Sequence, residues 1–281
     1  MSQETQAPQA SEIIKKTAVY QIPGMDAVTV HRDVVYRQTG TGDLTLDVYS
    51  PPAPADGASG ARTPAVILVA GYSDVGFGKM LGCRFKDMGS SVSWARLIAA
   101  SGLTAITYAN REPAADLQAL LGYLRENAEP LGIDETRIGA WASSGNVPLA
   151  LSLLLRDAAP PLRCAALSYG FMLDLDGATG TAEASRQFGF VNPCAGKTLD
   201  DLAPHAADTP LFLARAGKDQ FPHLNESIDR FVAGALARNL PVTLVNHPEA
   251  PHAFDLFLDN EMSREVIRQI LGFLRFQLGV L

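Results

Sequence analysis

A serine lies among small residues where a predicted strand meets a predicted helix. Residues 142–146 read Ala-Ser-Ser-Gly-Asn, between apolar segments at 137–141 and 147–155. Small side chains allow the sharp turn that lifts a serine hydroxyl clear of the backbone, and the first N–H groups of the following helix then point to where an oxyanion forms. The run therefore predicts Ser144 as a nucleophile for acyl transfer and Gly145 as the donor of one oxyanion N–H.

Two other interpretations of this run stay open. Ser143 becomes the central serine if the motif starts at Trp141, although tryptophan fits the crowded first position poorly. A serine beside a helix start is also commonly an N-cap, whose oxygen only accepts a backbone hydrogen bond. A hydroxyl nucleophile needs a base, and the base needs a partner that fixes its tautomer, so the assignment depends on finding both.

A histidine and an aspartate stand where such partners are expected. His252 lies in a proline-flanked loop after the last predicted strand, where the active sites of α/β proteins gather. Asp219 follows the end of another predicted strand, although an aspartate there is more often part of an ordinary turn. Ser144, Asp219 and His252 each follow a separate strand, so we predict a nucleophile, an orienting carboxylate and a general base. The chain has four other histidines: His31, His205, His223 and His247.

Short apolar runs alternate with helical patterns, which is typical of a mostly parallel sheet covered by helices on both faces. The predicted strands are 65–70, 104–108, 137–141, 164–168, 211–214 and 242–245. Apolar residues at helical spacing predict helices around 117–124, 147–155, 228–236 and 266–274. Apolar residues alternate over 28–36 and again over 44–48, which predicts an antiparallel hairpin ahead of the sheet.

The pattern indicates a single domain over residues 17–281. Residues 1–16 are polar and lack periodicity, so we expect a mobile tail. Residues 72–93 and 171–208 are too long for ordinary connections and are predicted to be lid-like insertions. Their apolar side chains either line a pocket above Ser144 or only hold the insertions on the sheet; these are Met80, Leu81, Phe85, Met88, Phe171, Met172, Phe188 and Phe190.

Composition argues against several classes of protein. The formal charge is −7 and Lys and Arg are not clustered, so we expect neither nucleic acid nor an anionic membrane surface as a partner. Three widely spaced cysteines give no disulfide framework and no zinc-ligand spacing. No apolar run reaches the roughly 18–20 residues of a membrane span. We expect a cytoplasmic protein that needs no metal and no organic cofactor.

From about residue 27 onward the chain resembles the α/β-hydrolases, and among them the esterase-like and dienelactone-hydrolase-like members. The motifs that carry this resemblance are Arg137-Ile-Gly-Ala-Trp before the serine, Gly-Lys-Asp219, and Pro-His252-Ala-Phe. The resemblance implies the α/β-hydrolase fold, with an eight-stranded, mainly parallel sheet. It also implies Ser144 as nucleophile, His252 as general base and then acid, and Asp219 as the orienting carboxylate.

The chain departs from the family pattern at the serine and after the first buried strand. Ala142 and Asn146 stand where the elbow usually has glycines, and Asn146 leaves less room for helix packing. Ala-Gly-Tyr-Ser at 70–73 replaces the HGGG-like run of many esterases. By the resemblance, Gly71 or Tyr72 supplies the second oxyanion N–H.

We therefore expect hydrolysis of a carboxylic ester with a small or medium uncharged acyl group, through an acyl-enzyme. Arg84, Lys86 and Arg111 could each hold an anionic group singly, but no arginine cluster is present. The alternatives are a peptidase, a thioesterase or dienelactone-type hydrolase of the same fold, and a non-catalytic binding protein. Dienelactone hydrolases commonly use a cysteine, and no cysteine occupies the elbow. Apolar residues near the C-terminus predict a homodimer contact: Phe273, Phe276, Leu278 and Val280.

Overall fold

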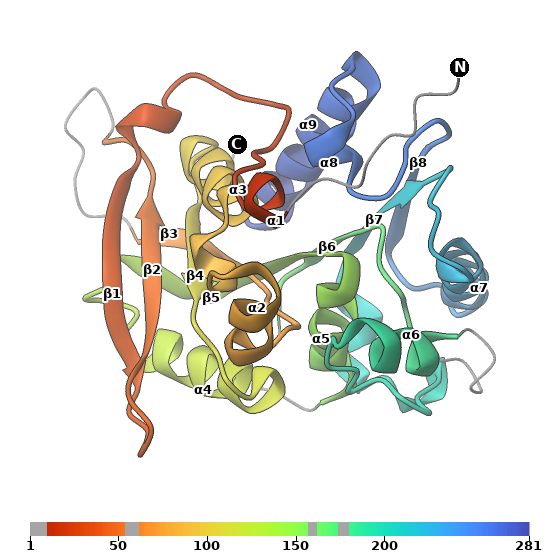
Figure 1. The fold of residues 1–281 in the computed structure, drawn as a ribbon, viewed down its shortest axis with the longest axis horizontal. Coiled ribbons are helices and arrows are strands. Elements are labelled where there is room, and N and C mark those ends of the chain that lie inside the picture. Colours follow the sequence, from red (N-terminus) through yellow and green to blue (C-terminus); the bar gives the residue numbers. More distant parts are fainter. Residues whose placement is uncertain (1–9, 54–61, 157–161, 174–179, 281) are drawn as a thin grey trace.

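The structure, a computed structural model, describes residues 10–53, 62–156, 162–173 and 180–280. These residues form an eight-stranded sheet in the order β1-β2-β4-β3-β5-β6-β7-β8 (Figure 1). Strand β2 is antiparallel to both of its neighbours, and the remaining pairs are parallel. The strands are β1 (Thr29–Arg37), β2 (Leu44–Ser50), β3 (Thr63–Leu68), β4 (Thr104–Tyr108), β5 (Ile133–Ser143), β6 (Ala165–Ser168), β7 (Leu211–Ala216) and β8 (Val242–His247). The predicted mostly parallel sheet is confirmed.

Helices cover both faces of the sheet, and each face has its own apolar core. The helices are α1 (Ala10–Ile13), α2 (Asp74–Leu81), α3 (Gly89–Ala100), α4 (Pro113–Glu126), α5 (Val147–Leu151), α6 (Thr181–Phe188), α7 (Leu224–Ala237), α8 (Phe254–Phe257) and α9 (Glu261–Gln277). Helices α3 and α9 contribute to one core, and α4, α5 and α7 to the other (Figure 1). Within the described ranges, every helix falls short of the length and apolar character that crossing a bilayer requires.

Both predicted insertions contain helices. The segment 72–93 holds α2, a 3₁₀ turn at Phe85–Asp87 and the start of α3. The segment 171–208 holds α6 and 3₁₀ turns at Leu199–Asp201 and Pro204–Asp208; its residues 174–179 lie outside the described residues. The apolar spacing did not indicate α2, because Gly76 and Gly78 interrupt it.

Part of the predicted N-terminal tail packs on the domain. Residues 10–13 form α1, and the amide of Gly89 donates to the carbonyl of Ile14 at 2.8 Å. A Cβ atom at position 89 would lie 2.8 Å from the Lys15 carbonyl oxygen, so the glycine admits this close approach. Residues 14–16 therefore lie against the start of α3, while the prediction for residues 1–9 lies outside the described residues.

The C-terminal apolar residues are used unequally. Leu278 is buried, and Phe273 packs on Phe212 with ring centroids 5.5 Å apart. Phe276 is 73% exposed. The patch proposed for a dimer contact is therefore smaller than the sequence indicated, and the homodimer stays a prediction.

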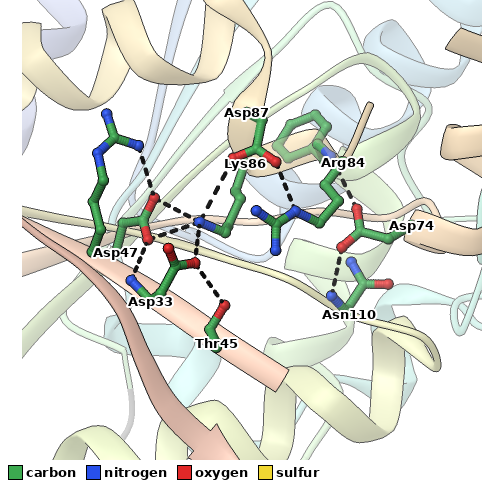
Figure 2. Close-up of polar contacts among 10 residues, drawn as sticks. Asp33, Thr45, Asp47, Asp74, Arg84, Lys86, Asp87 and Asn110 are labelled. Atoms are coloured by element: carbon green, nitrogen blue, oxygen red, sulfur yellow. Dashed lines mark hydrogen bonds and ion pairs between the residues drawn. The ribbon is translucent and has the colours of Figure 1, made fainter. Parts of the chain in front are cut away.

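A buried lysine anchors the insertion between α2 and α3 to the sheet. Lys86 is 1% exposed, and its Nζ lies 2.8 Å from both carboxylate oxygens of Asp47 in β2 (Figure 2). Asp33 in β1 lies 3.2 Å from the same Nζ. Asp74, at the start of α2, accepts from the amides of Phe85 and Asn110, each at 2.9 Å. These contacts hold both ends of α2 in place.

We expect Lys86→Met to lower the free energy of unfolding by about 3–5 kcal/mol, because it leaves the buried Asp47 carboxylate with only the half-exposed Arg32, 3.6 Å away, as a counter-charge. Urea denaturation measures this change. The matched control is Lys197→Met, since Lys197 is 45% exposed in its pair with Asp201 and should contribute less than about 1 kcal/mol. Similar losses in the two variants would contradict an anchoring role for Lys86.

Candidate active site

Ser144 occupies a strained turn between β5 and α5. Strand β5 ends at Ser143, a 3₁₀ turn spans Ser144–Asn146, and α5 starts at Val147. Ser144 has φ 56°, in the left-handed region that side chains other than glycine rarely adopt. Ser143 is the extended residue before the turn, and its side chain makes no capping bond. This geometry favours a nucleophile elbow at Ser144 over the N-cap interpretation.

Glycines on the neighbouring strands make room for this turn. A Cβ atom at Gly71, after β3, would lie 2.7 Å from the Gly145 carbonyl oxygen. A Cβ atom at Gly170, after β6, would lie 2.6 Å from the Ser144 carbonyl oxygen and 2.3 Å from a methyl carbon of Val147. In the family pattern, glycines beside the serine leave room for the turn. In this chain, Gly71 and Gly170 leave that room from the two neighbouring strands.

Asn146 has a specific partner where the family pattern has glycine. Its side chain is buried, and its Oδ1 accepts from the Gly71 amide at 2.7 Å. This bond ties the elbow to the loop after β3. The sequence indicated that Asn146 leaves less room for helix packing, and the structure accommodates its side chain through this hydrogen bond.

The three residues predicted to act together meet at one edge of the sheet. Ser144 Oγ lies 2.7 Å from His252 Nε2, and His252 Nδ1 lies 2.7 Å from Asp219 Oδ2. The Asp219 side chain is fully buried, and its Oδ1 also accepts from the Phe221 amide at 3.0 Å. A proton on Nδ1, donated to Asp219, leaves Nε2 free to accept the Ser144 hydroxyl proton.

Two aromatic rings also contact the imidazole. Phe221 and Tyr169 each contact His252 edge to face, with ring centroids 4.5 Å and 5.0 Å away. The Tyr169 hydroxyl donates to Asp255, a buried carboxylate in α8 that also accepts from Trp94 Nε1 at 2.7 Å. Burial raises the pKa of Asp255, and burial together with the nearby Asp255 charge raises the pKa of Tyr169. The Tyr169 hydroxyl therefore keeps its proton and remains a donor.

Two apolar cavities adjoin the Ser144 hydroxyl. One, of about 150 Å³, is lined mainly by aromatic side chains and Leu224, and the other, of about 230 Å³, extends between α2, α3 and α8. Tyr72, Met80, Ser144 and His252 line both. Met80, Phe171, Phe188 and Phe190 line the first and Leu81, Phe85 and Met88 the second, so the insertions contribute walls to the pocket.

The three cations proposed as anion clamps lie elsewhere. Lys86 is buried against Asp47, and Arg84 pairs with Asp87 at 2.6 Å. Arg111 donates to the turn of the β1–β2 hairpin, at Thr39, Thr41 and Gly42. None of the three lines either cavity. Within the described residues, no group of three or more His, Cys, Asp or Glu side chains is placed to hold a metal ion.

Comparison with known proteins was made at the level of sequence and of structure. No protein-family model and no curated protein matches the sequence. A bacterial heroin esterase matches with a TM-score of 0.67 and 15% identity, over 92% of this chain and 87% of the other. Thermogutta terrifontis esterase 2, phosphorylated by paraoxon, matches with a TM-score of 0.61 and 19% identity, over 93% and 96%. MGS-M1, an α/β hydrolase from a Medee basin deep-sea metagenome library, matches with a TM-score of 0.61 and 16% identity, over 90% and 99%.

The chain has the α/β-hydrolase fold. The strand order, the parallel core of the sheet and these structural matches agree on it. In this fold, the ends of β5, β7 and β8 bring Ser144, Asp219 and His252 together.

The sequence did not indicate Tyr169, which contacts His252, or Asp255, which accepts from the Tyr169 hydroxyl. Tyr169 directly follows β6 with φ 37°, and Asp255 lies three residues after His252. One signal was available, since Asp255 is a charged residue inside the otherwise apolar run Phe254–Phe257. A buried carboxylate needs donors, but only the fold shows that Tyr169 and Trp94 supply them.

We expect Tyr169→Phe to lower the free energy of unfolding by about 1–3 kcal/mol, because it removes the Tyr169 donor from the buried Asp255 carboxyl and leaves that of Trp94. Tyr36→Phe is the matched control, since the buried Tyr36 hydroxyl donates to the neutral carbonyl of Ala109 at 2.7 Å. That variant should lose about 0.5–1.5 kcal/mol. Chemical denaturation compares the two, and a larger loss in Tyr36→Phe would contradict the importance of the Tyr169–Asp255 hydrogen bond.

Proposed function

We propose that this protein is a serine hydrolase of carboxylic esters with small or medium uncharged acyl groups. The observation that carries the proposal is the continuous hydrogen-bond chain from Ser144 Oγ through the His252 ring to Asp219, at the meeting point of two apolar cavities. A hydroxyl activated in this way attacks carbonyl carbon.

The reaction proceeds in two acyl transfers. Ser144 Oγ attacks the ester carbonyl carbon while its proton passes to His252 Nε2, and the carbonyl oxygen becomes an oxyanion near Gly145. The intermediate collapses, and the leaving alcohol takes the proton from Nε2. Water then attacks the acyl-serine ester with His252 as base, which releases the carboxylic acid and restores the hydroxyl. Asp219 holds the Nδ1 proton and stabilises the imidazolium throughout.

The character of the cavities supports an uncharged substrate. Their walls are mainly apolar, and the nearby cationic side chains are paired elsewhere in the fold. An anionic acyl group would lose its hydration in such a cavity without gaining a counter-charge. The esterases among the structural matches support ester over amide as the scissile bond.

We further infer a cytoplasmic location for the protein. Cys83 and Cys164 are free cysteines, as is usual in reducing compartments. The partner that we propose is a small-molecule ester, with no cofactor required by the two-step reaction.

Hydrolysis of 4-nitrophenyl acetate should be lost in Ser144→Ala and in His252→Ala. Paraoxon should phosphorylate the wild-type chain at Ser144 and expel 4-nitrophenol, because an activated serine oxygen attacks phosphorus as it attacks carbonyl carbon. Mass measurement of the Ser144 peptide detects the adduct. Ser143→Ala is the control and should keep both reactions. Unchanged hydrolysis in Ser144→Ala would refute the assignment, and a chain that never reacts with paraoxon would favour a binding protein.

We expect 4-nitrophenyl butyrate to be a far better substrate than the hemisuccinate of 4-nitrophenol. The two acyl groups have the same number of carbons, but only the hemisuccinate carries a carboxylate at neutral pH. Desolvation of that charge should lower kcat/KM by at least about tenfold, since 1.4 kcal/mol already corresponds to that factor. Release of 4-nitrophenol, corrected for the uncatalysed rate, measures the ratio. Equal values would show that a cation reaches the acyl group.

A further inference from the structure

The described part of the chain buries three acidic residues, and one of them has no cationic partner. Asp47 pairs with Lys86, and Asp116 pairs with Arg37. Asp255 is 3% exposed and pairs with no lysine, arginine or histidine among the described residues. A buried carboxylate without a counter-charge costs free energy, so its presence beside a reactive serine indicates a role in the reaction.

Asp255 lies close to the catalytic imidazole. It lines the larger cavity together with Ser144 and His252, and it is the second residue of α8, which starts two residues after His252. Tyr169 contacts both side chains, because its hydroxyl donates to Asp255 Oδ1 and its ring centroid lies 5.0 Å from that of the imidazole. A single side chain therefore links the carboxyl group to His252.

The contacts of Asp255 favour its ionised form. Trp94 Nε1 donates to Oδ2 at 2.7 Å and the Tyr169 hydroxyl donates to Oδ1, so both oxygens act as acceptors. Burial raises the pKa of Asp255, while these two hydrogen bonds and the nearby His252 oppose that rise. The backbone is fixed as well, since the Asp255 carbonyl accepts from the Val19 amide at 2.8 Å.

We propose that Asp255 is a positioning residue whose carboxylate stabilises the imidazolium that His252 becomes during acyl transfer. The proposal rests on the proposed function. When the Ser144 proton passes to His252 Nε2, the ring carries a positive charge until the leaving alcohol takes that proton. Asp219 faces Nδ1, and Asp255 adds a second negative charge without exchanging a proton. The missing cationic partner of Asp255 is thus one that forms only during the reaction.

This arrangement stabilises the transition state more than the resting enzyme. The imidazole is neutral before the attack, so the attraction to Asp255 grows as the proton moves, and only such growing interactions raise the rate of the chemical step. A fixed charge in an apolar cavity acts more strongly than one in water and needs no reorganisation.

The other titratable side chains on the elements around His252 are neutral or exposed. Burial raises the pKa of Tyr72 to about 12, and burial together with the Asp255 charge raises the pKa of Tyr169, so neither phenol is charged near neutral pH. His247 is buried at the end of β8, against Phe254. The remaining side chains are more than half exposed and form the pairs Lys218–Glu249 and His223–Glu226. Solvent screens these pairs, which leaves Asp219 and Asp255 as the buried charges.

Asp255→Asn tests this role because it removes the charge and keeps the shape. The new amide can accept from Trp94 and donate to the Tyr169 oxygen. We expect kcat/KM for 4-nitrophenyl butyrate to fall about 3–10-fold at its maximum. The midpoint of the acid limb of the kcat/KM profile should move to lower pH by about 0.5–1 pH unit, because the imidazolium loses a stabilising charge. Release of 4-nitrophenol is followed at a wavelength where its protonated and ionised forms absorb equally.

Two control variants separate the charge from its structural effects. Asp116→Asn also removes a buried aspartate, but one that Arg37 neutralises, so the acid limb should keep its midpoint. Phe254→Leu removes a ring that packs on Tyr169, with centroids 5.5 Å apart, and changes no charge. It should lower stability and leave the midpoint in place.

An unchanged acid limb in Asp255→Asn overturns the proposal, even when Ser144→Ala is inactive and the proposed function stands. An equal movement in Asp116→Asn also overturns it, since net charge alone then explains the effect. A wild-type chain that hydrolyses no ester overturns both the proposal and the proposed function.

Infrared spectroscopy tests the charge of Asp255 even if Asp255→Asn does not fold. Burial also raises the pKa of Asp74, so the spectrum of Asp74→Asn is recorded beside that of the wild type. We expect no C=O band of a protonated carboxyl in Asp74→Asn at neutral pH. A band that persists there would show a neutral Asp255 and would overturn the proposal.

Discussion

The left-handed backbone of Ser144 is the constraint on which the site depends. A non-glycine residue in that region costs about 1–3 kcal/mol, so its surroundings must enforce the conformation. Strand β5 delivers the chain at Ser143, α5 takes it away at Val147, and Gly71 and Gly170 allow the neighbouring strands to close on the turn. Between these elements the turn brings Ser144 to the wall of both cavities.

The same kind of strain recurs around the imidazole. Of the six described non-glycine residues with positive φ, three belong to the site: Ser144, Tyr169 and Ala253. Tyr169 turns back at the end of β6 to reach His252, and Ala253 turns the chain from His252 into α8, which carries Asp255. Asp219 fixes one nitrogen of the ring, while Tyr169 and Phe221 restrict its tilt. The histidine thus has one orientation available.

The sequence indicated the strands and the three reactive residues because their signals are local. Continuous apolar runs mark buried parallel strands. Ser144 directly follows β5, and Asp219 and His252 lie in the loops after β7 and β8. The sequence did not predict helix α3, because two of the residues on its buried face, Ser91 and Ser93, are polar and interrupt the apolar pattern. The buried Ser93 has a hydrogen-bond partner in the N-terminal segment, because its Oγ accepts from the Ala18 amide at 2.9 Å. Contacts between distant segments, such as Asn146 with Gly71 or Asp255 with Tyr169, leave no local pattern.

The distribution of charge explains why an insertion with several charged residues can form the wall of an apolar cavity. The charged side chains of the segment 84–88 pair with one another or with the sheet, as Figure 2 shows for Arg84, Lys86 and Asp87. The two apolar side chains of the same segment, Phe85 and Met88, line the larger of the two cavities beside Ser144. Asp47 of β2 neutralises the positive charge of Lys86, and neither side chain lines the cavities beside Ser144. Under the proposed function, a charged substrate would therefore find neither Arg84 nor Lys86 in the cavities, and the polar groups beside Ser144 are those of the elbow and His252.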